Sequence, residues 1–195
     1  MTTDDPLHFL LARRSVPSRQ LGEPGPDHAT LQRMLQAAVR VPDHGKLVPF
    51  RLLAIAGDDR LALGEFLAAR SLQRDPQAPT AAVEKDRQRF SFAPLIVAVV
   101  ARSVAHPKVP EQEQWLTAGS VCFALLQAAQ ALGYGAQWLT GWAATDPAVL
   151  HHLGLAEDEG IAGFIHIGTP KLEAPERDRP DPATLLQWWD GGAAA

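Results

Sequence analysis

Three short segments of the chain carry side chains that could do chemistry, and the first of them is Arg13-Arg14-Ser15. Two guanidinium groups and a hydroxyl within three residues supply the donors that a phosphomonoester needs. Basic residues in the last turn of a helix also interact favourably with the helix dipole, and the pattern alone favours that structural interpretation. The segment is therefore a candidate anion site, with a helix end as its alternative.

The second segment, Arg40 to Lys46, places an arginine, a histidine and a lysine within seven residues. We expect a loop between a helix and a strand, and binding residues are common on loops that a rigid scaffold positions. His44 could donate a hydrogen bond to an anionic ring or titrate near neutral pH. A lone loop histidine is equally often just exposed to solvent, so the spacing favours neither interpretation.

The third segment, Ala136 to Trp142, has the sequence AQWLTGW. Its pattern favours Trp138 and Trp142 as core or interface aromatics. The functional interpretation is a strand end where Thr140 and Gly141 let the backbone approach a flat ligand. The sequence contains no GxGxxG fingerprint, P-loop, GxSxG elbow or HExxH motif. A flavin or nucleotide site would therefore not be of the Rossmann or Walker type, and no metal site is predicted.

Regular elements must position these segments, and the hydrophobic periodicity predicts where those elements lie. Helices are expected over residues 6–14, 28–40, 60–70, 81–90, 112–132 and 147–153, with Asp27 and Asp146 as N-caps. Strands are expected over 51–56, 94–101, 136–140 and 161–168, and loops over 41–49 and 71–80. The strand at 94–101 is apolar throughout and should be central, covered on both faces. Strands separated by helices indicate an α/β or α+β class in which helices cover a sheet.

The composition is that of one globular domain, residues 1–195, with 46% hydrophobic residues. The net charge of −4 and the lack of a basic stripe argue against a nucleic-acid or polybasic membrane partner. The longest apolar run, residues 94–101, is far shorter than the ~20 residues that span a bilayer. The one cysteine, Cys122, cannot form a disulfide within its own chain and is expected to be a buried helix residue. We therefore expect a cytoplasmic protein.

Four stretches of the chain, in this order, resemble the nitroreductase family in its short branch. They are RRSV at 13–16, LQRMLQAAVRVPDHGKLVPFR at 31–51, KVPEQEQWLTAGSVCFALLQAAQALGYGAQWLTG at 108–141 and IAGFIHIGTPKL at 161–172. The resemblance implies an α+β fold, an α/β sandwich whose central, mostly antiparallel sheet is flanked by helices. It also implies a homodimer that binds FMN in two active sites at the dimer interface, each built from both subunits.

The same resemblance implies a set of FMN contacts, carried over residue by residue. The expected contacts are Arg13, Arg14 and Ser15 at the phosphate and ribityl end, Arg40, His44 and Lys46 in the loop beside the flavin, and Trp138, Leu139 and Thr140 along the other side. Longer family members also use a basic residue near the C-terminus for the phosphate. The candidates for that contact are Lys171, Arg177 and Arg179, and the sequence does not choose among them.

The implied activity is a two-electron transfer from NAD(P)H to a small acceptor, a nitroaromatic, a quinone or an enone, by a ping-pong mechanism. The flavin N5 carries the hydride, so no side chain is expected to act as a catalytic nucleophile. His44 could donate a proton to the acceptor, but this role ranks below binding. One alternative is a flavin- or anion-binding sensor or storage module without efficient turnover. The other, a helical interaction protein without a ligand, leaves the basic clusters of an acidic chain unexplained.

Overall fold

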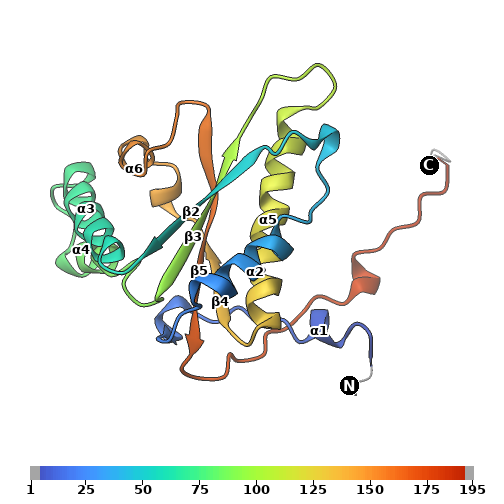
Figure 1. Cartoon of the computed structure of the whole chain (residues 1–195), viewed down its shortest axis with the longest axis horizontal. Helices are drawn as coiled ribbons and strands as arrows, with labels where there is room; N and C mark the ends of the chain where they lie inside the picture. The colour runs from blue at the N-terminus through green and yellow to red at the C-terminus, as the bar shows by residue number, and fades with distance from the viewer. Residues whose placement is uncertain (1–4, 192–195) are drawn as a thin grey trace.

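The computed structural model describes residues 5–191 and contains an antiparallel sheet flanked by helices (Figure 1). Its strands are β1 (Leu21–Gly22), β2 (Phe50–Ala56), β3 (Leu95–Arg102), β4 (Gly135–Leu139) and β5 (Glu159–Pro170). Their order is β1-β5-β3-β2, and β4 also pairs with β5. Every one of these pairs is antiparallel, which confirms the predicted sheet type. Because residues 164–167 of β5 pair with both neighbours, β5 joins β4 to the core strand β3.

Six helices and four short 3-10 turns connect the strands in the described part of the chain. They are α1 (His8–Leu11), η1 (Ser18–Gln20), α2 (His28–Ala38), η2 (His44–Lys46), α3 (Asp59–Arg74), α4 (Thr80–Arg87), α5 (Glu111–Ala131), η3 (Trp142–Ala144), α6 (Pro147–His152) and η4 (Pro182–Thr184). Both predicted N-caps are confirmed. The Asp27 carboxylate accepts from the Thr30 N–H at 2.7 Å, and the Asp146 carboxylate accepts from the Ala148 N–H at 3.0 Å.

Several predicted helix ends are wrong: α2 ends at Ala38 instead of residue 40, α4 ends at Arg87 instead of residue 90, and α1 and α3 differ for reasons that the structure shows. α1 ends at Leu11 instead of residue 14, because the chain then runs beside β4, where the Val16 N–H donates to the Ala136 carbonyl at 3.0 Å. α3 continues through residues 71–74, which were expected to be loop. It stops only at Asp75, which precedes a proline and is therefore held in an extended conformation.

Alternate residues of β3 contribute to two hydrophobic cores. Leu95, Val97 and Val99 face α2 and α5, which pack against each other on one side of the sheet. The residues between them face the opposite core, which contains side chains from α3 and α6. Residues 95–101 of β3 are all buried, which confirms the prediction of a strand covered on both faces.

The long helix α5 is buried along most of its length, and Cys122 at its middle has no exposed surface. Burial in apolar surroundings raises the pKa of the Cys122 thiol to about 12, so the thiol stays protonated at neutral pH. Gly133 follows the helix with φ +81°, the left-handed conformation of a helix stop. The helix therefore ends within one residue of the predicted end at residue 132.

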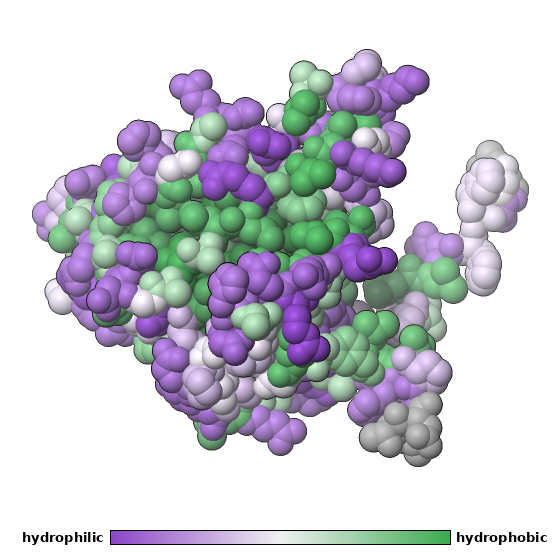
Figure 2. Space-filling view, in the orientation of Figure 1, coloured by the Kyte–Doolittle hydropathy of each residue, from purple (hydrophilic) through white to green (hydrophobic). Residues whose placement is uncertain are grey.

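One stripe of α5 and two segments near the chain ends keep large apolar side chains on the surface. On α5 these are Trp115, Leu116 and Phe123. Figure 1 shows α1 and the tail after β5 projecting from the body of the molecule on the same side, and Figure 2 shows hydrophobic surface on both. Their exposed apolar residues are Leu7, Phe9, Leu10, Leu11, Leu185, Leu186, Trp188 and Trp189. Apolar surface gathered in this way is typical of interaction sites.

Within residues 5–191, no helix has the length and apolar character needed to cross a membrane. The same residues contain no group of three His, Cys, Asp or Glu side chains arranged to hold a metal ion.

Candidate active site

Arg13, Arg14 and Ser15 lie on the extended segment that follows α1. Arg14 caps that short helix, since its Nη1 donates to the Leu11 carbonyl at 3.0 Å, as the structural interpretation expected. The Arg13 side chain does not take part in the cap. Its Nη1 donates to the Ser15 Oγ at 3.2 Å, which leaves the guanidinium beside the hydroxyl that was predicted to share its ligand.

The C-terminal tail brings two more arginines to Arg13. Burial lowers the pKa of Arg13, and the positive charges of Arg179, Arg14 and Arg177 lower it further. Glu176 pairs with Arg14 and lies 3.8 Å from Arg179. We call Arg13, Arg14, Arg177 and Arg179 the arginine cluster. Four guanidinium groups that repel one another form a favourable place for a multivalent anion.

The structure brings two of the three C-terminal basic residues considered from the sequence close to Arg13. Arg177 and Arg179 belong to the arginine cluster, whereas the Lys171 side chain folds over Gly22, within 2.6 Å of where a Cβ would stand. The sequence could not make this choice, because only the path of the tail after β5 decides which side chain reaches Arg13.

A second basic site lies further along the same segment, which runs beside β4. The Ser18 N–H donates to the Gln137 Oε1 at 2.6 Å and fixes this part of the chain. Here a pocket of about 200 Å³ opens between the segment, α4 and the end of β4. Its lining includes Ser18, Arg19, Lys85, Arg89, Phe92 and Leu139, and we call it the basic pocket. Sequence reasoning missed its three cations, because they come from regions far apart in the chain.

Arg89 is the most constrained of these cations. Its Nη2 donates to the Asp86 Oδ1 at 2.8 Å, and its Nη1 abuts Gly141, where a Cβ would stand only 2.9 Å away. Its Nε is buried and has no hydrogen-bond partner among the described residues. An unmet charged donor at the edge of a pocket fits a ligand that presents an acceptor.

Trp138, Leu139 and Thr140 were predicted to follow one side of a cofactor, and the pleat of β4 divides them. The Trp138 indole lies flat over Gly163, where any side chain would collide with it, and donates to the Ala162 carbonyl at 3.1 Å. Leu139 points to the opposite face and lines the basic pocket. Thr140 is exposed, next to Gly141, whose φ of +69° suits a glycine.

Arg40 shares an open groove with Trp138. This groove, about 540 Å³, runs along the exposed stripe of α5. Its lining includes Arg40, Pro42, Leu116, Gly119, Phe123 and Trp138. Arg40, predicted from the second segment, and Trp138, predicted from the third, are therefore brought together on the apolar surface of the molecule.

The loop that carries His44 and Lys46 is tightly fixed. The Asp43 carboxylate accepts from the N–H groups of Leu47 and Val48 at 3.1 and 2.9 Å. Lys46 and Val48 have φ values of 54° and 49°, a conformation that is costly for residues other than glycine. His44 Nδ1 lies 2.8 Å from the Glu113 Oε2, which attaches the loop to the first turns of α5.

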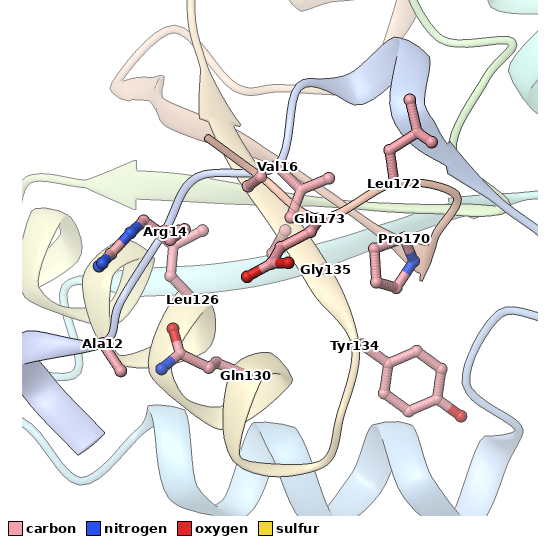
Figure 3. A pocket seen from close by; sticks show the side chains of 12 residues that line it. Ala12, Arg14, Val16, Leu126, Gln130, Tyr134, Gly135, Pro170, Leu172 and Glu173 are labelled. Atoms are coloured by element: carbon pink, nitrogen blue, oxygen red, sulfur yellow. The ribbon is translucent and has the colours of Figure 1, made fainter. Parts of the chain in front are cut away.

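The arginine cluster and His44 lie at opposite ends of α5. Arg14 lines a pocket of about 390 Å³ together with Gln130, near the last turn of the helix (Figure 3). His44 contacts Glu113, near the first turn. Because the two α5 residues are 17 positions apart, they are separated by about 26 Å at 1.5 Å per residue. Within one chain, the two predicted halves of the site are not brought together.

Comparison with known proteins agrees with this fold. The model of the nitroreductase family matches residues 10–169. A relative in Escherichia coli strain K12, YdjA, provisionally named an NAD(P)H nitroreductase, is 34% identical over 186 residues, which cover 95% of this chain and 100% of the relative.

Two solved structures show the same fold at low identity. A nitroreductase-like family protein from Bacillus cereus superposes with a TM-score of 0.80 at 20% identity, over 98% of this chain and 100% of the other. A nitroreductase with bound FMN from Bacteroides fragilis gives a TM-score of 0.70 at 20% identity, over 96% and 100%. The family model and the bacterial relative together show that the chain belongs to the nitroreductase family.

Proposed function

We propose that this protein is an FMN-dependent oxidoreductase that transfers two electrons from NAD(P)H to a small acceptor, a nitroaromatic, a quinone or an enone. One observation carries the proposal: residues 13–19 connect the arginine cluster to the basic pocket along the edge of β4. The relatives add support, because YdjA is named for NAD(P)H and the Bacteroides structure holds FMN.

The donors of this chain fit FMN at both ends. The arginine cluster and the Ser15 hydroxyl suit a phosphate dianion. The unpartnered Arg89 Nε, with Arg19 and Lys85, suits a ring edge that carries carbonyl oxygens and gains negative charge on reduction. A side chain at position 141 would press on Arg89, because its Cβ would stand too close to the guanidinium. Glycine at this position therefore leaves room beside that pocket.

When bound, FMN would supply the redox chemistry, hydride acceptance and donation at N5. The arginine cluster would hold the phosphate and so orient the ring. Arg19, Lys85 and Arg89 would stabilise the anionic reduced ring by electrostatic preorganisation, in which one well-placed donor can contribute a few kcal/mol. No side chain is required as a nucleophile.

A second copy of the chain would complete the site. The exposed stripe of α5, with Gly119 and Ser120 between Trp115 and Phe123, suits a two-fold pairing of antiparallel helices. An axis near Ser120 would set Glu113, seven residues before it, opposite the partner's Gln127, seven residues after it. Each His44 loop would then approach the other chain's arginine cluster. We therefore propose a homodimer in which Arg40 and His44 serve the partner's FMN, with proton donation by His44 secondary to binding.

The decisive test is whether the purified protein retains FMN and is reduced by NAD(P)H. We expect a yellow protein that releases one FMN per chain and bleaches rapidly with NAD(P)H under anaerobic conditions. Parallel double-reciprocal plots would support ping-pong turnover in one shared pocket. A colourless protein that takes up no FMN would refute the proposal, and bound FMN that NAD(P)H bleaches only slowly would favour the sensor or storage module.

We place the protein in the cytoplasm, where one unpaired thiol is ordinary.

A further inference from the structure

Asp86 is a buried carboxylate that the proposed chemistry does not use directly. Only 8% of its surface is exposed, and it lies on α4, three residues before Arg89, which lines the basic pocket. Its Oδ1 accepts two hydrogen bonds, from the Arg89 Nη2 at 2.8 Å and from the Trp142 Nε1 at 3.0 Å. Asp86 therefore ties a cation of the pocket to the turn that follows Trp138–Thr140.

The Asp86 carboxylate forms an ion pair with Arg89. Burial alone would raise the pKa of Asp86, but hydrogen bonds from Arg89, Trp142 and Ser71 and the charge of Arg89 outweigh it and hold that pKa below its usual range, so the carboxylate is ionised at neutral pH. The nearby cation Arg74, which stacks on the Trp142 ring at 4.4 Å, has its own carboxylate, Asp146, at 3.5 Å.

His166, in the layer next to Arg89, adds no charge of its own. Its ring is buried, stacks on Phe90 and has no hydrogen-bond partner among the described residues. Burial, assisted by the positive charge of Arg89, lowers the pKa of His166 to about 4, so the ring is neutral at pH 7. At pH 7 the charge next to His166 is therefore that of the Arg89–Asp86 pair.

We propose that Asp86 is a positioning residue that sets the reduction potential of FMN bound at the basic pocket, by holding Arg89 in place and offsetting part of its charge. The inference rests on the proposed FMN site. A guanidinium next to the ring stabilises the reduced, anionic form more than the neutral oxidised form. A carboxylate bonded to the same guanidinium reduces that preference, so the pair fixes how readily the flavin accepts electrons.

Asp86→Asn tests this, because the bonds from Arg89 and Trp142 both use Oδ1 and an amide oxygen can accept both, while the hydroxyl of Ser71, the third partner, can donate to or accept from an amide. The guanidinium stays confined between Gly141 and the Trp142 ring. We expect Asp86→Asn to favour reduced over oxidised FMN about tenfold more than the wild type does, which for a two-electron couple raises the potential by ~30 mV. Arg89→Met should shift the potential in the opposite direction, and the double variant should resemble Arg89→Met.

The measurement is the midpoint potential of bound FMN against a reference dye under anaerobic conditions, together with the Kd for oxidised FMN. Glu65→Gln is the matched control, since Glu65 is an exposed carboxylate on α3 that pairs with Arg87 outside the basic pocket, and its potential should equal that of the wild type. If Asp86→Asn does not fold, Asp86→Ser removes the same charge and carries the same expectation.

The outcomes separate this inference from the function on which it rests. A potential that Asp86→Asn leaves unchanged or lowers, while FMN remains bound, overturns the role of Asp86 and leaves the FMN site standing. A lowered melting temperature without a potential shift would show that Asp86 is only structural, and also overturns it. A wild-type protein that binds no FMN refutes both proposals.

Discussion

Basic residues lie near both ends of α5, but the two groups differ in how far one chain brings them together. At the C-terminal end, arginines from residues 13–14 and from the tail at 177–179 meet in one chain and repel one another, so this end is ready to receive an anion. At the N-terminal end, the His44 loop is rigid and bonded to Glu113, yet it faces the surface about 26 Å away. One end gathers its basic residues within the chain, whereas under the proposed dimer the other end serves a neighbouring chain.

The strongest way to break this comparison is to prevent the second copy from docking. Phe123→Glu puts a carboxylate in the middle of the exposed α5 stripe, where dimerisation would bury it unpaired at a cost of about 4 kcal/mol. We expect a monomer in sedimentation velocity and FMN affinity roughly 1,000-fold lower. Leu61→Glu, at an equally exposed site on α3, should change neither quantity. A monomeric variant that binds FMN like the wild type would show that one chain suffices.

His166 lies in the layer beneath the basic pocket, away from both ends of α5. The pH dependence of the protein's stability tests its burial. Because the pKa of His166 falls from 6.5 to about 4 on folding, the unfolded chain binds more protons between these values. His166 therefore makes its full contribution to the free energy of unfolding above pH 6.5. That free energy falls by about 3 kcal/mol as the pH drops to 4. His166→Leu should remove this part of the acid dependence in urea unfolding, whereas exposed His151→Leu should retain it. An unchanged acid limb in His166→Leu would contradict the pKa shift.

Phosphate binding by the arginine cluster can be tested by comparing FMN with riboflavin, which lacks the phosphate. Arg13→Ala should weaken FMN binding by about 2 kcal/mol, roughly 30-fold, because a charge-assisted phosphate contact is lost. Riboflavin binding should not change. Arg33→Ala, an exposed arginine on α2, is the control for net charge. Equal losses for FMN and riboflavin would remove Arg13 from the phosphate site.

The smallest effect concerns the preorganisation of the His44 loop. Asp43→Ala leaves the N–H groups of Leu47 and Val48 without their acceptor and frees a strained backbone. We expect faster amide exchange over residues 44–48 and a loss of about 1 kcal/mol, roughly fivefold, in FMN affinity. Asp75→Ala removes a similar loop contact, to the Gln77 N–H, and should leave FMN affinity unchanged. Exchange in 44–48 as slow as in the wild type would show that Asp43 does not hold the loop.

Local signals predicted most of the fold. The N-caps at Asp27 and Asp146, the apolar strand at 94–101 and the glycine stop after α5 are each encoded by a few adjacent residues. The ends of α1 and α3 were wrong for opposite reasons. Pairing with β4 overrides helix propensity near Arg13, and helix propensity persists through residues 71–74 until a proline intervenes.

The candidate site could be predicted only where its residues are neighbours in sequence. Arg13-Arg14-Ser15 was visible as a cluster, but Arg19, Lys85 and Arg89 become neighbours only through folding. The adjacent Trp138 and Leu139 were expected on one surface, yet the two-residue period of a strand sends them to opposite faces. The assigned roles of all these residues in binding FMN stay predictions.

Cys122 has a consequence for how electrons leave the protein. It is the only cysteine of the chain, it is sealed inside α5, and it keeps its proton at any physiological pH. A flavin that relays electrons through protein sulfur needs two thiols within reach, and this chain has no such pair. Under the proposed function, the flavin would therefore pass its electrons on without a dithiol relay within the chain. The compounds reduced would then depend on what can reach the flavin.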